Sequence, residues 1–464
     1  MSTLPLTPVL GPVTEVPSHG FPAMSRRKIF WAVLLFIGFW FARPYYLPWT
    51  EADELNADTR ATAAQGSIER ELAMPCLAVL ACYMLWRSRP TPRFKGHLAM
   101  AAVAYCAVNA ASVAWSVDPS TSIRRLSVFM MDVLIVIALA KVFTLLDLAK
   151  IGFYACGIVA AMAFFIDVFI TRSFRPLDPD YRLMGVMSSN SQGQNLSICI
   201  FCGLSLLLLY RQGGRWLAPS LFFAAALLYF TRSRTASITC LIFSLFFIKR
   251  LVDAKYRRET RIMATLLLVA IIVPPIIAHG NLSSIVEDSF MMGRNDTQNT
   301  ASLSNRMPLW SELTDYVAQR PWLGFGYNAF WTSERITVIS EHQGWPVPNA
   351  HNTYLDQELS SGIAAVLLFT FIFWGGLYVA WKRYRRNPSA ETLLPAAILS
   401  WLFLTSWVEA VPLDPFLPTI LAYVCLAKSF MPEAASTAAE PLDPATTAPV
   451  NLIEMPALAN LQTR

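Results

Sequence analysis

Apolar residues along this chain are gathered into long runs, which are separated by short polar stretches rich in Arg, Pro and Ser. A membrane-spanning helix needs about 20 mostly apolar residues, and shorter runs are tolerated where their flanks reach the interface. The pattern therefore predicts an all-α, polytopic integral membrane protein with about twelve transmembrane helices. These helices are expected at roughly residues 29–42, 71–86, 97–115, 127–145, 149–170, 195–210, 216–230, 236–248, 262–278, 362–381, 391–407 and 415–428.

The composition supports lipid as the solvent of these runs. Of the 464 residues, 55% are hydrophobic and 15% are charged, whereas soluble domains carry about a quarter charged residues. A large soluble helical protein is disfavoured, because too few polar faces remain to cover so many apolar helices. The eight cysteines lie in or beside apolar runs and form no pattern with His. Small buried or lipid-facing side chains are therefore favoured over disulfides or metal ligands.

The apolar runs divide the chain into segments. We expect transmembrane helices one to nine within 29–278 and helices ten to twelve within 362–430. Between them lies one large loop, 279–361, which is much longer than the connections elsewhere and is therefore expected to be functional. The ends, 1–28 and 431–464, are rich in Pro, Ala and Thr and lack periodicity, so we predict disordered tails.

Basic residues predict the orientation of the helices. Clusters of Lys and Arg at 26–28, 87–95, 211–215, 249–261 and 382–386 occur in alternate connections. The positive-inside rule places these connections, and both chain termini, in the cytoplasm, so that the large loop is periplasmic.

Arg and Lys are distributed differently between the two sides. With this orientation the eight lysines lie in or near the cytoplasmic half, at 28, 95, 141, 150, 249, 255, 382 and 428. The outer connections contain Arg but no Lys. Because guanidinium binds phosphate through a planar fork of donors, this choice favours a phosphate or diphosphate site at the outer surface. Exposed surface arginines without a function are the alternative reading.

The large loop ends in a segment that suits acid–base chemistry. Asn349 is the expected N-cap of a helix, which would place His351 in its first turn. The positive end of the helix dipole disfavours imidazolium, so His351 should remain neutral and able to accept a proton. The same helix end attracts an anion such as phosphate. A structural histidine at the membrane surface is the alternative.

Further candidate residues lie in the other outer connections. Arg232 and Arg234 stand in a very short connection, where a charge at the membrane surface is usually partnered. Arg182 precedes the polar run 188–195, and Arg124 opens the helix that follows 115–119. The acidic residues near the outer helix ends are candidate counter-charges for these arginines or acceptor-binding groups, with plain interfacial carboxylates as the alternative: Asp132, Asp167 and Glu409.

Taken in order, these fragments resemble the O-antigen ligase and polymerase superfamily, which includes bacterial exopolysaccharide polymerases. The resemblance covers about residues 110–365 and includes the large outer loop. Each fragment is weakly specific, but their order is fairly specific. The fragments are 115–119, 182–185, 233–236, Arg306 with Trp310, 321–327 and 350–355.

The resemblance implies a metal-independent glycosyltransferase without a cofactor, working at the periplasmic face of the inner membrane. The implied donor is an undecaprenyl-diphosphate-linked oligosaccharide, and the acceptor is a sugar hydroxyl. By the same similarity His351 is the general base, and Arg234 and Arg306 bind the donor diphosphate. Arg182 is a weaker match for that role. Candidate supporting residues are Arg232, Arg124, Asn352 and Tyr354.

Several functions stay open at this stage. A polymerase of exopolysaccharide repeat units and a ligase that transfers glycan to lipid A-core share donor, fold and motifs; the two tails favour the polymerase. A transporter or flippase would place charges near the middle of the bilayer within repeated halves, which the sequence does not suggest. A non-catalytic chain-length regulator would not need His351. The expected partners are the lipid bilayer and polysaccharide export and chain-length machinery, with no nucleic acid.

Overall fold

A computed structural model describes the chain at residues 24–42, 68–88, 96–176, 178, 181–209, 216–253, 306–411 and 414–431. Within these ranges the regular structure is helical and contains no strand, which confirms the all-α prediction. The helix predicted at 262–278 lies outside the described residues, and so do 1–23 and 432–464.

Every other apolar segment predicted above overlaps a helix of the described part of the chain. The helices are α1 (Arg26–Ala42), α3 (Ile68–Arg87), α4 (His97–Ala111), η1 (Ser112–Trp115), α5 (Pro119–Val142), α6 (Leu145–Phe165), η2 (Ile166–Ile170), α7 (Ser189–Leu209), α8 (Leu217–Phe230), α9 (Arg234–Asp253), α13 (Arg306–Gln319), α14 (Ser333–Gln343), α15 (Thr353–Arg386), α16 (Ala390–Ser406) and α17 (Leu417–Phe430). Four described helical stretches are long and apolar enough to cross a membrane, which indicates a membrane protein: His97–Trp115, Leu145–Ile170, α7 and α15.

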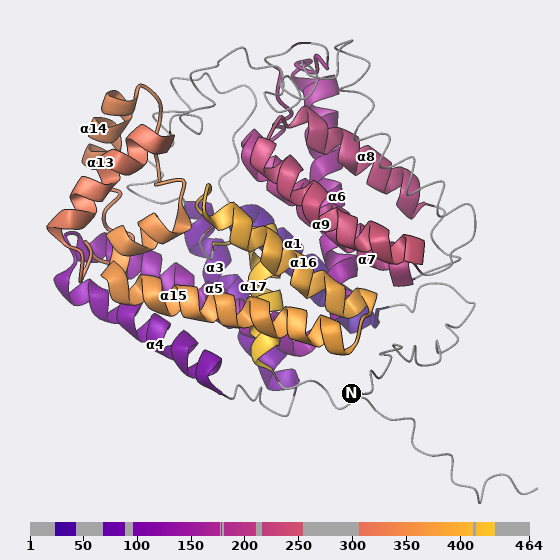
Figure 1. Cartoon of the computed structure of the whole chain (residues 1–464), viewed down its shortest axis with the longest axis horizontal. Helices are drawn as coiled ribbons and strands as arrows, with labels where there is room; N and C mark the ends of the chain where they lie inside the picture. Colours follow the sequence, from indigo (N-terminus) through magenta and orange to yellow (C-terminus); the bar gives the residue numbers. More distant parts are fainter. Residues whose placement is uncertain are drawn as a thin grey trace, which may run out of the picture.

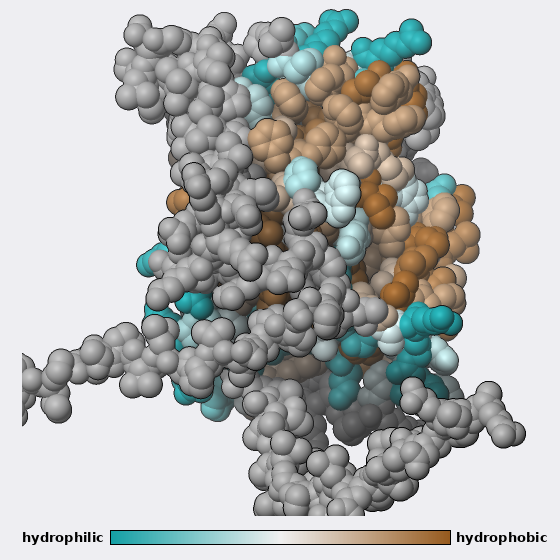
Figure 2. All heavy atoms as spheres, turned by 90° about the vertical axis from the view of Figure 1, so that its right-hand side faces the viewer, coloured by the Kyte–Doolittle hydropathy of each residue, from teal (hydrophilic) through white to brown (hydrophobic). Residues whose placement is uncertain are grey.

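Helix α7 occupies the interior of the bundle. It packs against α6, α8, α9, α16 and α17. Of its most apolar stretch, 83% is buried within the protein, against 17% for the stretch His97–Trp115, which comprises α4 and η1. Figure 1 shows α6 to α9 gathered on one side of the molecule and α4 beside α15 on the other. On the face drawn in Figure 2, hydrophobic side chains cover much of the described surface, and hydrophilic ones gather at its upper and lower edges. An apolar surface of this kind suits a lipid environment.

The lysines of the described residues gather at one end of the bundle. Lys28 Nζ lies 2.5 Å from Asp147 Oδ2 and so joins α1 to α6. Lys428 Nζ donates to the Ala140 carbonyl at 2.9 Å, which joins α17 to α5. Four further lysines lie near those ends of α5, α6, α9 and α15 that are on this side of the bundle: Lys141, Lys150, Lys249 and Lys382. We call this the lysine end; α15 and α17 begin at the opposite end.

Helices α13 and α14 form a small separate core at that opposite end (Figure 1). The segment 321–331 between them docks onto the helical bundle through its main chain. Phe325 accepts from the Val117 amide at 3.0 Å, and the Tyr327 amide donates to Ser112 Oγ at 2.9 Å. These contacts fix the α13–α14 unit, and with it the start of α15, against the junction of α4 and α5.

A glycine inside α15 makes this docking possible. Gly362 has φ 74° and ψ −175° and kinks the helix. A Cβ at this position would overlap the carbonyl oxygen of Trp322. Only glycine adopts this conformation without strain.

Replacing Gly362 by alanine should therefore destabilise the protein by about 3 kcal/mol, although alanine normally stabilises a helix by about 1 kcal/mol relative to glycine. Thermal unfolding in detergent measures the change. Gly157→Ala is the matched control, because a Cβ there meets only Cys199 Sγ at 3.7 Å; it should be neutral or stabilising. Equal stability of both variants would contradict the strain argument.

Candidate active site

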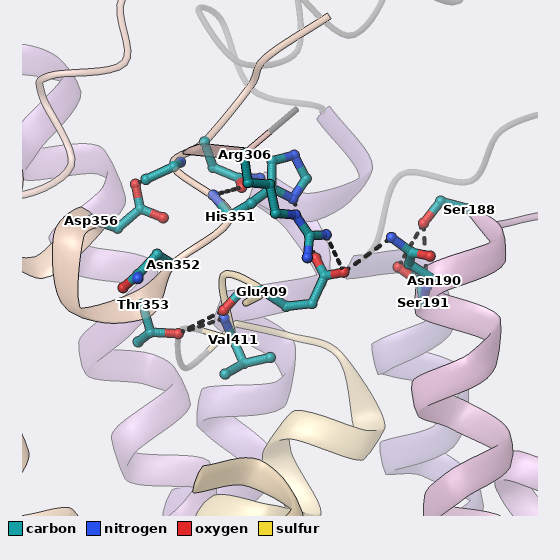
Figure 3. Close-up of polar contacts among 12 residues, drawn as sticks. Ser188, Asn190, Ser191, Arg306, His351, Asn352, Thr353, Asp356, Glu409 and Val411 are labelled. Atoms are coloured by element: carbon teal, nitrogen blue, oxygen red, sulfur yellow. Dashed lines mark hydrogen bonds and ion pairs between the residues drawn. The ribbon is translucent and has the colours of Figure 1, made fainter. Parts of the chain in front are cut away.

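Three polar side chains from three parts of the chain converge on one carboxylate, that of Glu409, at the end of the bundle opposite the lysine end. Glu409 Oε1 accepts from Arg306 Nη2 at 2.6 Å and from Asn190 Nδ2 at 3.1 Å. Its other oxygen, Oε2, lies 3.2 Å from His351 Nδ1. Figure 3 shows these groups pointing toward Glu409 from the starts of α7, α13 and α15. We call Glu409, Arg306, Asn190 and His351 the Glu409 network.

Thr353, the first residue of α15, holds Glu409 in place. Its hydroxyl donates to the Glu409 carbonyl at 3.0 Å and accepts from the Val411 amide at 3.0 Å. The Glu409 amide in turn donates to the Thr405 carbonyl at the end of α16. The segment after α16 is therefore tied to the start of α15. These hydrogen bonds fix the position of Glu409 relative to His351.

The predicted start of the helix at His351 is wrong. Asn352, not Asn349, is the N-cap, and its side chain accepts from the amides of Tyr354 and Leu355 at 3.0 and 3.1 Å. Asn349 instead accepts from the His351 amide at 2.9 Å, as in an Asx turn. His351 thus precedes the helix rather than lying in its first turn, with a left-handed φ of 47°. Non-glycine residues in this region are uncommon and often lie at functional sites.

The contact with Glu409 decides which ring nitrogen of a neutral His351 carries the proton. Burial raises the pKa of Glu409, but the hydrogen bond from His351 and the charge of Arg306 outweigh it, so the pKa lies below the usual range of a glutamate. The carboxylate therefore stays ionised, and it loses its charge only as the pH falls through that lowered pKa. A carboxylate only accepts hydrogen bonds, so Nδ1 of a neutral His351 carries the proton and Nε2 keeps its lone pair.

Arg182 joins the Glu409 network through Asn190. Its Nη2 donates to Asn190 Oδ1 at 3.0 Å, and its Nε donates to the Thr231 carbonyl at 3.3 Å. Asn190 thus bridges Arg182 and Glu409. The structure brings together three of the predicted site residues, Arg182, Arg306 and His351.

Arg234 lies at the first position of α9, close to the same end of α7. The preceding residue, Ser233, packs on Gly193, where an added Cβ would come within 2.9 Å of the Ser233 Cβ. Gly193 is about one helical turn beyond Asn190. Arg234 therefore begins its helix beside the start of α7.

The supporting arginines have distinct positions. Arg232 has a left-handed φ of 49° and donates to the carbonyls of Tyr181 and Asp178, each at 3.0 Å. Arg124 lies on α5 beside Arg125, whose guanidinium donates to main-chain carbonyls of the 321–331 segment. Arg232 therefore holds a loop of the site region, whereas Arg124 neighbours the docking segment.

Asn352 and Tyr354 shape the turn around His351. Besides capping α15, Asn352 donates from Nδ2 to the Trp407 carbonyl at 3.1 Å. The ring of Tyr354 packs on the Trp407 ring with centroids 4.6 Å apart. The ring of Trp345 lies 5.4 Å from that of His351. Asn352 and Tyr354 thus fix the main chain on which His351 stands.

The three acidic candidates have different surroundings. Glu409 pairs with Arg306, as expected for a counter-charge. Asp167 binds main-chain amides instead, and both oxygens of Asp132 are buried without a hydrogen-bond partner among the described residues. The part of the chain that the structure describes contains no group of three or more His, Cys, Asp and Glu side chains placed to hold a metal ion.

A comparison with known protein families identifies part of the chain. Residues 219–370 match the family model described as O-Antigen ligase. This part of the chain is therefore similar to an O-antigen ligase domain. This match confirms the resemblance to the O-antigen ligase and polymerase superfamily, whose members are glycosyltransferase-like enzymes. No curated protein matches the chain.

The matched residues supply only part of the Glu409 network. They include Arg234, Arg306 and His351, whereas Arg182, Asn190 and Glu409 lie outside them. Sequence reasoning recognised the polar run around Asn190 but not that residue, whose bridging contact depends on the packing of α7. The signal available in the sequence was the polar run 188–195 itself, directly before the apolar span predicted at 195–210.

Proposed function

We propose that the chain is a metal-independent glycosyltransferase of the bacterial inner membrane. It transfers a saccharide from an undecaprenyl-diphosphate carrier to a sugar hydroxyl at the periplasmic face. The observation that carries this proposal is the contact of His351 with Glu409 and of Glu409 with Arg306, within a chain that is similar in part to an O-antigen ligase domain.

The arrangement of His351 suits a general base. Nδ1 faces Glu409, so Nε2 accepts the proton of the acceptor hydroxyl as its oxygen attacks the anomeric carbon. The bond from that carbon to the diphosphate oxygen breaks, and its electron pair leaves with the diphosphate. Glu409 stabilises the imidazolium that forms, and the proton then passes to water or to the released diphosphate.

Arginines near this base suit the departing diphosphate. The Arg306 guanidinium has five N–H donors, and its contact with Glu409 is made through Nη2. Further donors therefore remain for phosphate oxygens. We assign the same role to Arg182 and Arg234 at the adjacent helix starts. Fixed positive charges of this kind stabilise a leaving group without reorganising during the reaction.

The orientation in the membrane follows from the distribution of charge. The lysine end is proposed to face the cytoplasm, together with both chain termini, and the Glu409 network to face the periplasm. His351 lies at the start of α15, whereas the lysine end lies at the other end of α15 and at the end of α17. This separation supports the proposed topology. The remaining apolar segment, 262–278, completes the proposed count of about twelve spans.

Reconstitution in liposomes with a defined undecaprenyl-diphosphate oligosaccharide tests the function. We expect longer lipid-linked products, since the Pro-rich and Ala-rich tails favour a polymerase of exopolysaccharide repeat units. Transfer to added lipid A-core would instead identify a ligase of the same family. Movement of the donor to the opposite leaflet without a new glycosidic bond would overturn the proposal in favour of a flippase.

A further inference from the structure

Asp167 organises the main chain around Arg182. It lies in the π-helical turn η2 at the end of α6 and is 4% exposed. Its Oδ2 accepts from the Tyr181 hydroxyl at 2.8 Å and from the Met184 amide at 3.3 Å, and its Oδ1 accepts from the Gly185 amide at 3.1 Å. Hydrogen bonds of this kind offset the cost of burying a carboxylate away from water. Single π-helical turns frequently lie at functional sites.

The turn held by Asp167 packs directly on α6. Gly185 has a left-handed φ of 62°, and a Cβ there would lie 2.5 Å from Ala163 Cα. The turn therefore has little freedom to shift along α6. Arg182 stands within this fixed segment.

A second set of hydrogen bonds joins this turn to the connection between α8 and α9. The Leu183 amide donates to the Phe230 carbonyl at 2.8 Å. Arg182 reaches across to the Thr231 carbonyl, while Arg232 reaches back to the Tyr181 carbonyl. The two arginine-bearing segments thus hold each other through reciprocal contacts.

We propose that Asp167 and Arg232 are positioning residues that set Arg182 for binding of the donor diphosphate. This inference rests on the proposed function and assigns to these two residues a role in the same site. Arg182 is a long side chain with considerable rotamer freedom, so its readiness to bind a phosphate depends on a fixed main chain. Asp167 fixes that main chain from α6, and Arg232 fixes it from the α8–α9 connection.

Binding of farnesyl diphosphate, a short polyprenyl diphosphate, to the full-length protein in detergent micelles tests this inference. Asp167→Asn keeps the shape but replaces Oδ2, the acceptor of two hydrogen bonds, by an amide donor. We expect its Kd to rise about tenfold, as for loss of a hydrogen bond to a charged group. Ser173→Ala is the control, because this nearby exposed hydroxyl pairs with Thr171, and its Kd should equal that of the wild type.

A double-mutant cycle separates positioning from a general effect on the fold. When Arg182 is replaced by alanine, Asp167→Asn should change the Kd by less than about twofold, because its effect acts through Arg182. An equal loss in both backgrounds, or wild-type binding by Asp167→Asn, would overturn the inference. Should Asp167→Asn fail to fold, Tyr181→Phe carries the same cycle, since it removes only one of the three hydrogen bonds; we expect about a threefold rise in Kd.

The outcome for the wild type separates this inference from the proposed function. If the wild type neither binds farnesyl diphosphate nor transfers saccharide, the proposed function fails, and the inference fails with it. If the wild type does both and Asp167→Asn binds equally well, only the positioning role fails.

Discussion

Replacing His351 by asparagine should reduce glycosyl transfer by about 10²–10⁴-fold, the usual contribution of a general base. Asparagine tolerates the left-handed conformation of this position and retains a donor toward Glu409. It cannot accept the proton of the acceptor hydroxyl, so chemistry is lost while the turn is kept. The kcat with a defined lipid-diphosphate donor measures the effect.

A matched histidine controls for the loss of an imidazole. His342 pairs with Glu312 between α13 and α14, and its side chain is 61% exposed. His342→Asn should therefore retain kcat. Full turnover by His351→Asn at normal expression and with wild-type thermal stability would refute the general-base role.

Replacing Glu409 by glutamine should lower kcat by about 10²–10⁴-fold, because the amide that takes the place of Oε2 donates instead of accepting. His351 must then accept at Nδ1, so its proton moves to Nε2, the atom proposed to act as the base. Arg306 keeps an oxygen acceptor but loses its charged partner. Stability should accordingly fall by about 1–3 kcal/mol, the cost of weakening a buried charged contact.

Steady-state kinetics and thermal unfolding of Glu409→Gln separate these two effects. Glu341→Gln removes a carboxylate from the exposed surface of α14 and should change neither quantity. A Glu409→Gln variant that lost stability but kept kcat would show that the carboxylate only neutralises Arg306. The tautomer of His351 would then not depend on Glu409.

The helices could be located from the sequence because each apolar run is long and uniform. Transfer of apolar groups from water favours burial or contact with lipid irrespective of the neighbouring helix, so the pattern fixes helix positions locally. Boundaries were less accurate: α15 begins at Thr353, well before the predicted apolar span. Its first turns contain polar side chains that are buried within the protein, among them Thr353, Gln357 and Ser360. The apolar pattern does not report such residues.

The choice of N-cap before α15 shows why local chemistry was insufficient. Asn349 and Asn352 are equally good capping residues by type. The contacts of Thr353 with Glu409 and Val411 place the first helical residue at Thr353, and these partners lie beyond α16. A tertiary contact therefore decided between two local alternatives of similar energy.

The sequence by itself determined the helical class, the apolar runs and, through the resemblance to a known family, the candidacy of His351, Arg306, Arg234 and Arg182. These features depend on residue type and local spacing. Only the tertiary structure decided that Glu409 faces His351 across 58 positions and Arg306 across 103. Asn190 and Asp167 gained their contacts in the same way. Electrostatic and hydrogen-bond contacts act over a few ångströms, so the folding of distant segments onto one end of the bundle determines which groups meet.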